Sequence, residues 1–335
     1  MSPAVRRPVA GAVRWIALFA SPALLSMGLL AVGAVGAAGC SSGNSRPSVD
    51  AGLDGSPSDG SADAPGDDAG ERIRTFCNDD DAEQWTAEAA PGAHCEVQSR
   101  IATVTVQAQG TGQWSAFATL LDSMDPRTGP PALADAQCAF FEYAPGDTCV
   151  CDEEEVCTYD NRCERRATPV TPSTLTLAGN GDGEETLTDD GSGTLYGTVS
   201  LDGETVALEL NGCALRVTAA ATAPPDALTG LSGTLEGGYE APEAVDITWD
   251  AVEPGSQVHT RVPINHHVGG PTFTECVVDA SSGSLHIDGA MLVPLAVVTG
   301  LEFQGISHVR FAAAETPYGC VEFRFETPAY VDLAY

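Results

Sequence analysis

The sequence predicts an all-β fold, with one or more antiparallel β-sandwiches, a cysteine-rich N-terminal portion and little helix. Three observations support this class. Apolar and polar residues alternate over many short segments, and Gly, Pro, Asn and Asp interrupt these segments at short intervals. The 11 cysteines suit the disulfide framework of an exported domain.

The first 39 residues are built like a secretory signal peptide. Three arginines are the only charged residues of this segment, and an apolar stretch covers residues 15–35. The boundary Ala37-Ala38-Gly39-Cys40 resembles the lipobox of bacterial lipoproteins. The resemblance implies cleavage before Cys40 and acylation of its thiol. It also implies attachment to the outer membrane, since Ser41 rather than an aspartate follows. A plain transmembrane anchor is the alternative, because the apolar stretch is long enough to span a bilayer.

Residues 40–71 are predicted to be a disordered tether. They are nearly all Ser, Asp, Gly, Pro and Ala, so they cannot bury enough apolar surface to offset the loss of chain entropy. A Pro-rich stretch at 224–242 divides the remainder into a cysteine-rich β module, 72–223, and a C-terminal β module, 224–335. One continuous sandwich across this boundary is the alternative.

The chain that follows the signal segment is strongly acidic. It has no lysine, and its 12 arginines stand against 47 Asp and Glu, which gives a formal charge of −35. Such a surface repels phosphate backbones and excludes nucleic acid as a partner. The absence of lysine also excludes Schiff-base chemistry and a P-loop.

Ten cysteines remain after Cys40, and an even number in an exported chain predicts five disulfides. Cys276–Cys320 is the first expected pair, because these are the only cysteines after the Pro-rich stretch. Cys149 and Cys151 should not bond to each other. A zinc site in this region is disfavoured, because the spacing is not that of a zinc ribbon. The ten residues are Cys77, Cys95, Cys138, Cys149, Cys151, Cys157, Cys163, Cys213, Cys276 and Cys320.

The clearest strand signal covers residues 194–219. Asp202-Gly203 and Asn211-Gly212 are hairpin-turn dipeptides, and two-residue turns at both predict a three-stranded antiparallel meander. Its register pairs Leu208 with Leu215, and Cys213 should be buried on the apolar face. The apolar face comprises Leu195, Val199, Leu201, Val206, Leu208, Leu210, Leu215 and Val217.

Period-two alternation predicts further strands through Leu175, Val245, Val258, Leu285, Val309 and Val321. Two segments are expected to be helical, 114–124 and a short turn within 289–296.

No metal site and no cofactor are predicted. The weak metal candidates are His266 and His267 in a loop, and Asp182 and Asp189 in an acidic turn that fails the EF-hand spacing. His259, His286 and His308 alternate with apolar neighbours. We therefore expect their side chains to face solvent.

The chain contains no G-x-S-x-G or H-E-x-x-H motif, so we expect no enzyme. The lipobox, the Ser/Asp/Gly/Pro spacer, Ile247-Thr248-Trp249 and the late single cysteines resemble poorly characterised myxobacterial surface lipoproteins. This resemblance implies a lipoprotein of unknown function and transfers no catalytic residue.

We expect a membrane-anchored protein with a binding or structural role at the cell envelope, and an envelope glycan or envelope protein as partner. An exported hydrolase with an unrecognised site and a calcium- or metal-dependent adhesion module are the alternatives.

Overall fold

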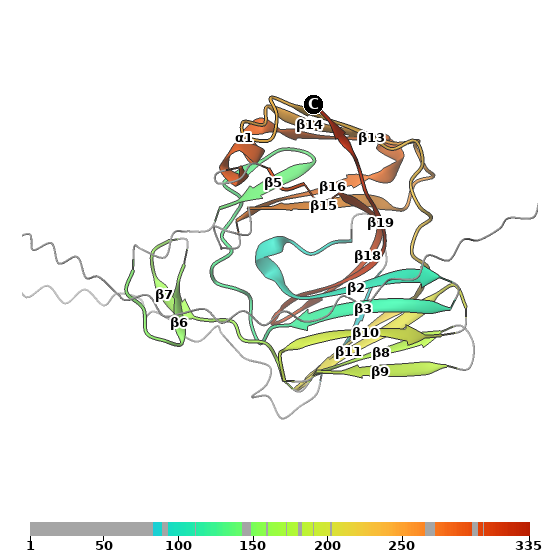
Figure 1. Ribbon diagram of the computed structural model, residues 1–335. Coiled ribbons are helices and arrows are strands. Elements are labelled where there is room, and N and C mark those ends of the chain that lie inside the picture. Colours follow the sequence, from blue (N-terminus) through green and yellow to red (C-terminus); the bar gives the residue numbers. More distant parts are fainter. Residues whose placement is uncertain are drawn as a thin grey trace, which may run out of the picture. The chain divides into compact units, whose positions relative to one another are not determined.

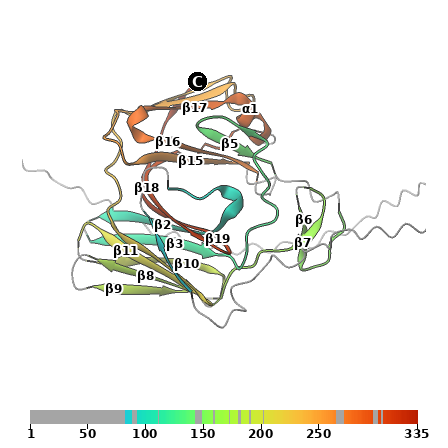
Figure 2. The same cartoon turned by 180° about the vertical axis from the view of Figure 1, so that it is seen from behind.

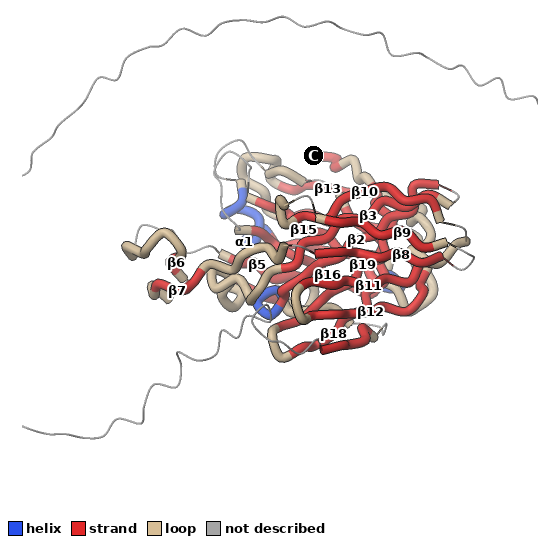
Figure 3. The backbone as a smooth tube through the Cα atoms, turned by 90° about the horizontal axis from the view of Figure 1, so that it is seen from below, coloured by secondary structure: helices blue, strands red, loops and turns tan. Residues whose placement is uncertain are grey.

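The computed structural model describes residues 83–335 except 89–92, 111, 143–148, 159, 172, 180–182, 190, 202, 265–271, 297–300 and 304. The described residues form three larger β-sheets and one two-stranded ribbon (Figures 1 and 3). The predicted all-β class is confirmed. The helical elements of the described part are α1 (Gly289–Leu292) and the 3-10 turns η3 (Val97–Ser99), η4 (Ala280–Ser282) and η5 (Val293–Leu295).

The largest sheet has nine strands, and they come from both sides of residues 224–242. The predicted module boundary therefore does not separate two independent sheets. The third and fourth strands of the nine-stranded sheet, in the order given next, are parallel to each other. All other neighbouring strands of this sheet are antiparallel. In order, the strands are β10 (Thr194–Ser200), β3 (Gln113–Leu120), β2 (Arg100–Gly110), β19 (Gly319–Ala329), β18 (Ile306–Thr316), β15 (Gln257–Pro263), β16 (Phe273–Asp279), β5 (Cys138–Phe141) and β4 (Leu133–Ala134).

The strands β18 and β19 bend strongly, so the nine-stranded sheet has a convex and a concave face (Figures 1 and 2). A five-stranded sheet packs on the convex face over β2, β3, β10 and β19. The shared core contains Leu177, Leu208 and Val217 from one sheet and Val104, Ala118 and Phe323 from the other. The five strands, in order, are β1 (Glu83–Ala87), β12 (Leu215–Thr222), β11 (Val206–Gly212), β8 (Ser173–Gly179) and β9 (Glu184–Thr188).

A four-stranded sheet covers the convex face over β15, β16 and β5. This second core includes Ile247 and Ile287 from the small sheet, and Val258 and Val278 from the large one. Helix α1 contributes Leu292. The four strands, in order, are β17 (Ser284–Asp288), β14 (Ala244–Thr248), β13 (Ser232–Glu236) and β20 (Leu333–Ala334).

The cysteine-rich segment forms a small ribbon of β6 (Glu155–Cys157) and β7 (Cys163–Arg165). Two disulfides staple it, Cys149–Cys157 and Cys151–Cys163. As predicted, Cys149 and Cys151 are not bonded to each other.

The predicted pair Cys276–Cys320 is wrong. Cys276 bonds to Cys138, and Cys320 bonds to Cys95. The reason lies in the sheet order, because β18 and β15 separate the strands that carry Cys276 and Cys320. Cys276 instead lies opposite Cys138 in the β16–β5 register.

The predicted meander is half correct. Its apolar side chains are buried in one core. However, β10 does not pair with β11; it joins the nine-stranded sheet beside β3, so the chain crosses the core after β10. The remaining hairpin turns at Cys213-Ala214, and Leu208 pairs with Ala219 rather than Leu215.

Because the turn lies two residues later than predicted, Cys213 is a turn residue rather than a strand residue. It has a positive φ of 51° and is exposed, which corrects its predicted burial. It is nevertheless disulfide-bonded.

The expected helix at 114–124 is also wrong, because residues 113–120 form β3. Trp114, Ala116, Ala118 and Leu120 all enter the first core, with period two. The short turn expected within 289–296 is confirmed as α1 and η5.

Candidate functional site: the concave face

The side chains of the nine-stranded sheet that point away from both cores line its concave face. The register sets this face: Arg324 lies opposite Thr105, Thr105 opposite Phe117, and Phe117 opposite Tyr196. A second row of cross-strand partners lies two positions along each strand. It comprises Glu326, Gln107, Ser115 and Thr198. The face therefore carries charge at its centre and neutral groups towards the β10 edge.

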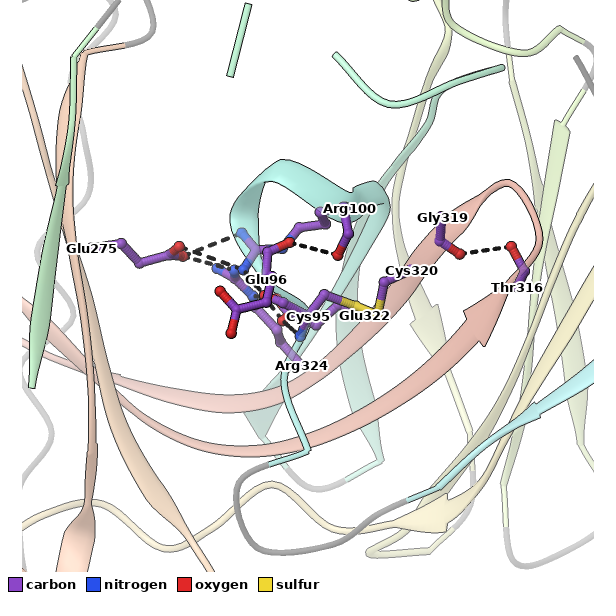
Figure 4. Close-up of a disulfide and its surroundings, with 10 residues drawn as sticks. Cys95, Glu96, Arg100, Glu275, Thr316, Gly319, Cys320, Glu322 and Arg324 are labelled. Atoms are coloured by element: carbon purple, nitrogen blue, oxygen red, sulfur yellow. Dashed lines mark hydrogen bonds and ion pairs between the residues drawn. A yellow bond between two sulfur atoms is a disulfide. The ribbon is translucent and has the colours of Figure 1, made fainter. Parts of the chain in front are cut away.

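A cluster of four charged side chains occupies the centre of the concave face (Figure 4). Arg100 Nη1 lies 3.3 Å from Glu275 Oε1, and Arg324 Nη2 lies 3.2 Å from the same oxygen. Arg324 Nε donates to Glu322 Oε1 at 2.6 Å. Arg100 Nη2 lies 3.4 Å from Glu322 Oε2. Two guanidinium groups thus neutralise two carboxylates, of which Glu322 is fully buried (0% exposed).

His259 completes this cluster. Its Nε2 lies 2.9 Å from Glu275 Oε1. Burial lowers the pKa of His259, and the charge of Arg324 lowers it further, so the ring is neutral near pH 7 and donates its Nε2–H to Glu275. Burial raises the pKa of Glu275, but the hydrogen bond from His259 and the charges of Arg100 and Arg324 outweigh it and hold that pKa well below its usual range. Glu275 is therefore ionised.

The same cluster fixes the segment before β2 inside the concave face. The backbone N–H of Cys95 donates to Glu322 Oε2 at 2.8 Å, and Arg100 Nη2 donates to the Cys95 carbonyl at 2.9 Å. The disulfide Cys95–Cys320 joins this segment to β19 covalently. Because each charge has a partner within the protein, we interpret the cluster as structural support for the surface around it.

Three hollows adjoin one another on the concave face, and all three are lined in part by Thr105. The largest has a volume of about 540 Å³. The second is about 390 Å³ and shares Phe117 with the first, and the third is about 270 Å³ and shares Arg261 with the second. The largest hollow is lined by Thr105, Gln107, Gln109, Gln113, Ser115, Phe117, Tyr196 and Thr198.

Two exposed aromatic rings form part of the floor of the largest hollow. Phe117 is 47% exposed and Tyr196 is 73% exposed, and they are direct partners across β3 and β10. Neither residue was expected at a binding site from the sequence. The feature that locates Phe117 is the period-two spacing of Trp114, Ala116 and Ala118. These three side chains are buried, so Phe117 lies on the opposite face of the strand.

Arg261 is a further cation of this face. Its guanidinium carbon lies 3.6 Å from the centre of the Phe273 ring, and Phe273 stacks in turn on Phe141 at 5.1 Å. Such cation–π packing orients the guanidinium.

Two of the three histidines predicted to face solvent are buried. His259 is not part of the second core, as its phase predicted, but it is buried because the sheet curves around that face (Figure 1). His308 is also buried, between Ser256 Oγ at 2.7 Å and the Asp226 carbonyl at 2.6 Å. His286 is exposed as predicted, with Nδ1 2.7 Å from Asp246 Oδ1.

Of the four weak metal candidates, the structure describes Asp189 alone. His266, His267 and Asp182 lie outside the described residues, as do Cys40, Cys77 and the tether. Asp189 Oδ1 accepts two backbone N–H groups, from Gly191 and Gly193, and so closes its own turn. The Sγ atoms of Cys149, Cys151 and Cys163 lie close together, but all three are in disulfides and supply no thiolate.

The arrangement of Ser256, His308 and the Asp226 carbonyl has the hydrogen-bond order of a hydroxyl nucleophile, a base and an orienting acceptor. A hydrolase also needs room for a substrate beside the hydroxyl. Neither Ser256 nor His308 lines a hollow of the concave face, and both are buried. We therefore interpret the pair as a structural tie between the start of β15 and β18.

No protein-family model matches the chain, and no curated protein matches it. Among solved structures, one match is the tetra-tandem repeat in the extending region of a large adhesion protein. It has 14% identity and a TM-score of 0.17, and the match covers 68% of this chain and 49% of that one. Another concerns host cell surface retention of a 1.5-MDa bacterial ice-binding adhesin, with 15% identity, a TM-score of 0.16, and coverage of 71% of this chain and 66% of that one. TM-scores this low carry no argument about function.

Among the described residues, no helix is both long enough and apolar enough to cross a membrane.

Proposed function

We propose that this protein is an exported lipoprotein that binds a partner at the cell envelope through the concave face of its nine-stranded sheet. The lipobox at Cys40 supports the anchor, and the disulfides are typical of proteins that fold in an oxidising compartment. In this arrangement the acyl chain holds the protein at the outer membrane, and the residues between Cys40 and the β domain act as a tether.

One observation carries the binding role. Two exposed aromatic rings line the largest of the adjoining hollows, and the second hollow is lined by Arg100 and Arg324 of the buried charge cluster, to which the Cys95–Cys320 disulfide is adjacent. Exposed aromatic side chains on a rigid, recessed surface are typical of binding sites, because they offer large contact area at little cost in conformational entropy.

The test is binding of the purified chain to isolated cell envelopes. The purified chain is residues 40–335 with Cys40→Ser, called the Cys40→Ser background below. It lacks both the apolar stretch 15–35 and the proposed acylation, so that only the tether and the β domain contribute. We expect Tyr196→Ala to weaken envelope binding about tenfold. Tyr335→Ala is the matched control, since Tyr335 is 90% exposed and follows β20 outside the concave face. Equal binding by the Tyr196→Ala and Tyr335→Ala variants would contradict the proposal.

A further inference from the structure

The largest hollow of the concave face is lined without a single charged side chain. Three glutamines, two threonines, a serine and two aromatic residues form it. The rest of the chain is strongly acidic, with 47 Asp and Glu in the sequence. The chemistry of this hollow therefore differs from that of the surrounding chain, and it limits what can bind.

The polar side chains of the hollow are already oriented. Gln107 Nε2 donates to Glu326 Oε1 at 2.6 Å, which fixes its amide. Gln109 Nε2 lies 3.4 Å from Gln107 Oε1 and 3.2 Å from Ser115 Oγ. A ligand that binds to this row meets groups whose rotamer freedom is largely lost beforehand, which reduces the entropic cost of binding.

The aromatic rings complement the amides. Phe117 and Tyr196 face each other across adjacent strands, where the Cβ atoms of such partners lie about 5 Å apart. The face of an aromatic ring is electron-rich, so it attracts the weakly positive C–H groups of a sugar ring. The neighbouring amides and hydroxyls suit the hydroxyls at the rim of the same sugar.

We propose that the concave face binds an uncharged polysaccharide, with Phe117 and Tyr196 as stacking platforms and the row of Gln107, Gln109 and Ser115 as its hydrogen-bonding partner. This inference rests on the proposed function and specifies its ligand class. A cation would need carboxylates, which this hollow lacks. The largest hollow has no arginine to bind a polyanion, and a chain with a formal charge of −35 would repel one.

The shape of the face favours a polymer over a single sugar. The three hollows adjoin one another through Thr105, Phe117 and Arg261, and together run from β10 across the sheet towards β15. At the central cluster the charges of Arg100 and Arg324 are balanced by Glu275 and Glu322. These four groups therefore present no net charge to a neutral polymer. Arg261, which also lines the second and third hollows, adds one cation, and its guanidinium packs on the Phe273 ring.

The test is affinity electrophoresis of the purified chain, in the Cys40→Ser background, through gels containing laminarin, dextran, galactomannan, arabinoxylan or polygalacturonate. We expect retardation by at least one of the uncharged polymers and none by polygalacturonate. Tyr196→Ala and Phe117→Ala should each weaken that retardation about tenfold, with Tyr335→Ala unchanged. Binding should also persist from low to high salt, since no charge is paired.

Two results would overturn the inference, and they are separable from failure of the proposed function. Binding to polygalacturonate alone, or to none of the five polymers, would refute the ligand class. If envelope binding still depended on Tyr196, the concave face would remain the binding surface and only the ligand class would fall. If neither envelope nor polymer binding depended on Tyr196, both proposals would fail.

Discussion

Glu275 accepts a hydrogen bond from His259 at 2.9 Å and contacts both Arg100 and Arg324. The Glu275 carboxylate thus links its own strand to β15, β2 and β19. Arg100 extends this link to the carbonyl of Cys95. Truncation to Glu275→Ala leaves two buried guanidinium groups partly unpaired, which should lower the free energy of unfolding by about 3–5 kcal/mol. Glu209→Ala breaks the more exposed pair with Arg216 and should cost about 1 kcal/mol or less. Urea denaturation measures both, and similar losses would contradict the structural role of the cluster.

Acidification should destabilise the fold through the same cluster. His259 has a folded-state pKa below its ordinary 6.5, so the unfolded chain binds the proton more readily. Its contribution to stability is complete above about pH 6.5 and is lost as pH falls through the folded-state pKa. The carboxyl of Glu275, with its pKa well below 4.5, contributes in the same direction at lower pH.

The variant His259→Gln should therefore flatten the dependence of unfolding free energy on pH below about pH 6.5. His308, whose pKa is also lowered by burial, should keep part of the slope. His286→Gln is the control with the opposite sign. Its hydrogen bond to Asp246 raises the pKa of an exposed ring, so its small contribution is present at low pH and lost as pH rises. An unchanged slope in His259→Gln would show that this ring does not titrate as described.

The disulfide pattern can be checked directly. Peptide mapping without reduction should recover Cys95–Cys320, Cys138–Cys276, Cys149–Cys157 and Cys151–Cys163. It should also recover a peptide linked to Cys213. A Cys276–Cys320 peptide would contradict the strand order of the nine-stranded sheet.

Acylation of Cys40 stays a prediction from the lipobox. Cells producing the protein should incorporate a fatty-acid analogue into it, and the Cys40→Ser variant should lose the label. The Cys77→Ser variant is a suitable control, because Cys77 lies outside the lipobox. Label that persists in Cys40→Ser would rule out the lipoprotein assignment.

The sequence predicts burial better than it predicts pairing. In β11, Leu208 and Leu210 are buried as their alternation indicates. Alternation identifies the buried face of a strand, but it does not identify the sheet to which the strand belongs. Leu195 and Leu208 therefore share a core although β10 and β11 lie in different sheets.

The candidate site could not be assembled from the sequence for a related reason. Phe117 and Tyr196 become neighbours only through the β3–β10 pairing, which joins segments far apart in the chain. His259 was placed on the correct side of its strand. However, the curvature of the sheet (Figure 1) and the side chains of Arg100 and Arg324 turn that side into a buried polar interior. The alanines of β3 also have a high helix propensity, although their spacing of two residues is typical of a strand.

The most direct test of the central claim, that the concave face is the binding surface, is backbone amide chemical-shift mapping. The purified chain in the Cys40→Ser background would be titrated with solubilised envelope polysaccharide. We predict shifts concentrated in β2, β3 and β10, around Thr105, Phe117 and Tyr196. Shifts confined to the four-stranded sheet of β17, β14, β13 and β20, or no shifts at saturating polysaccharide, would contradict it.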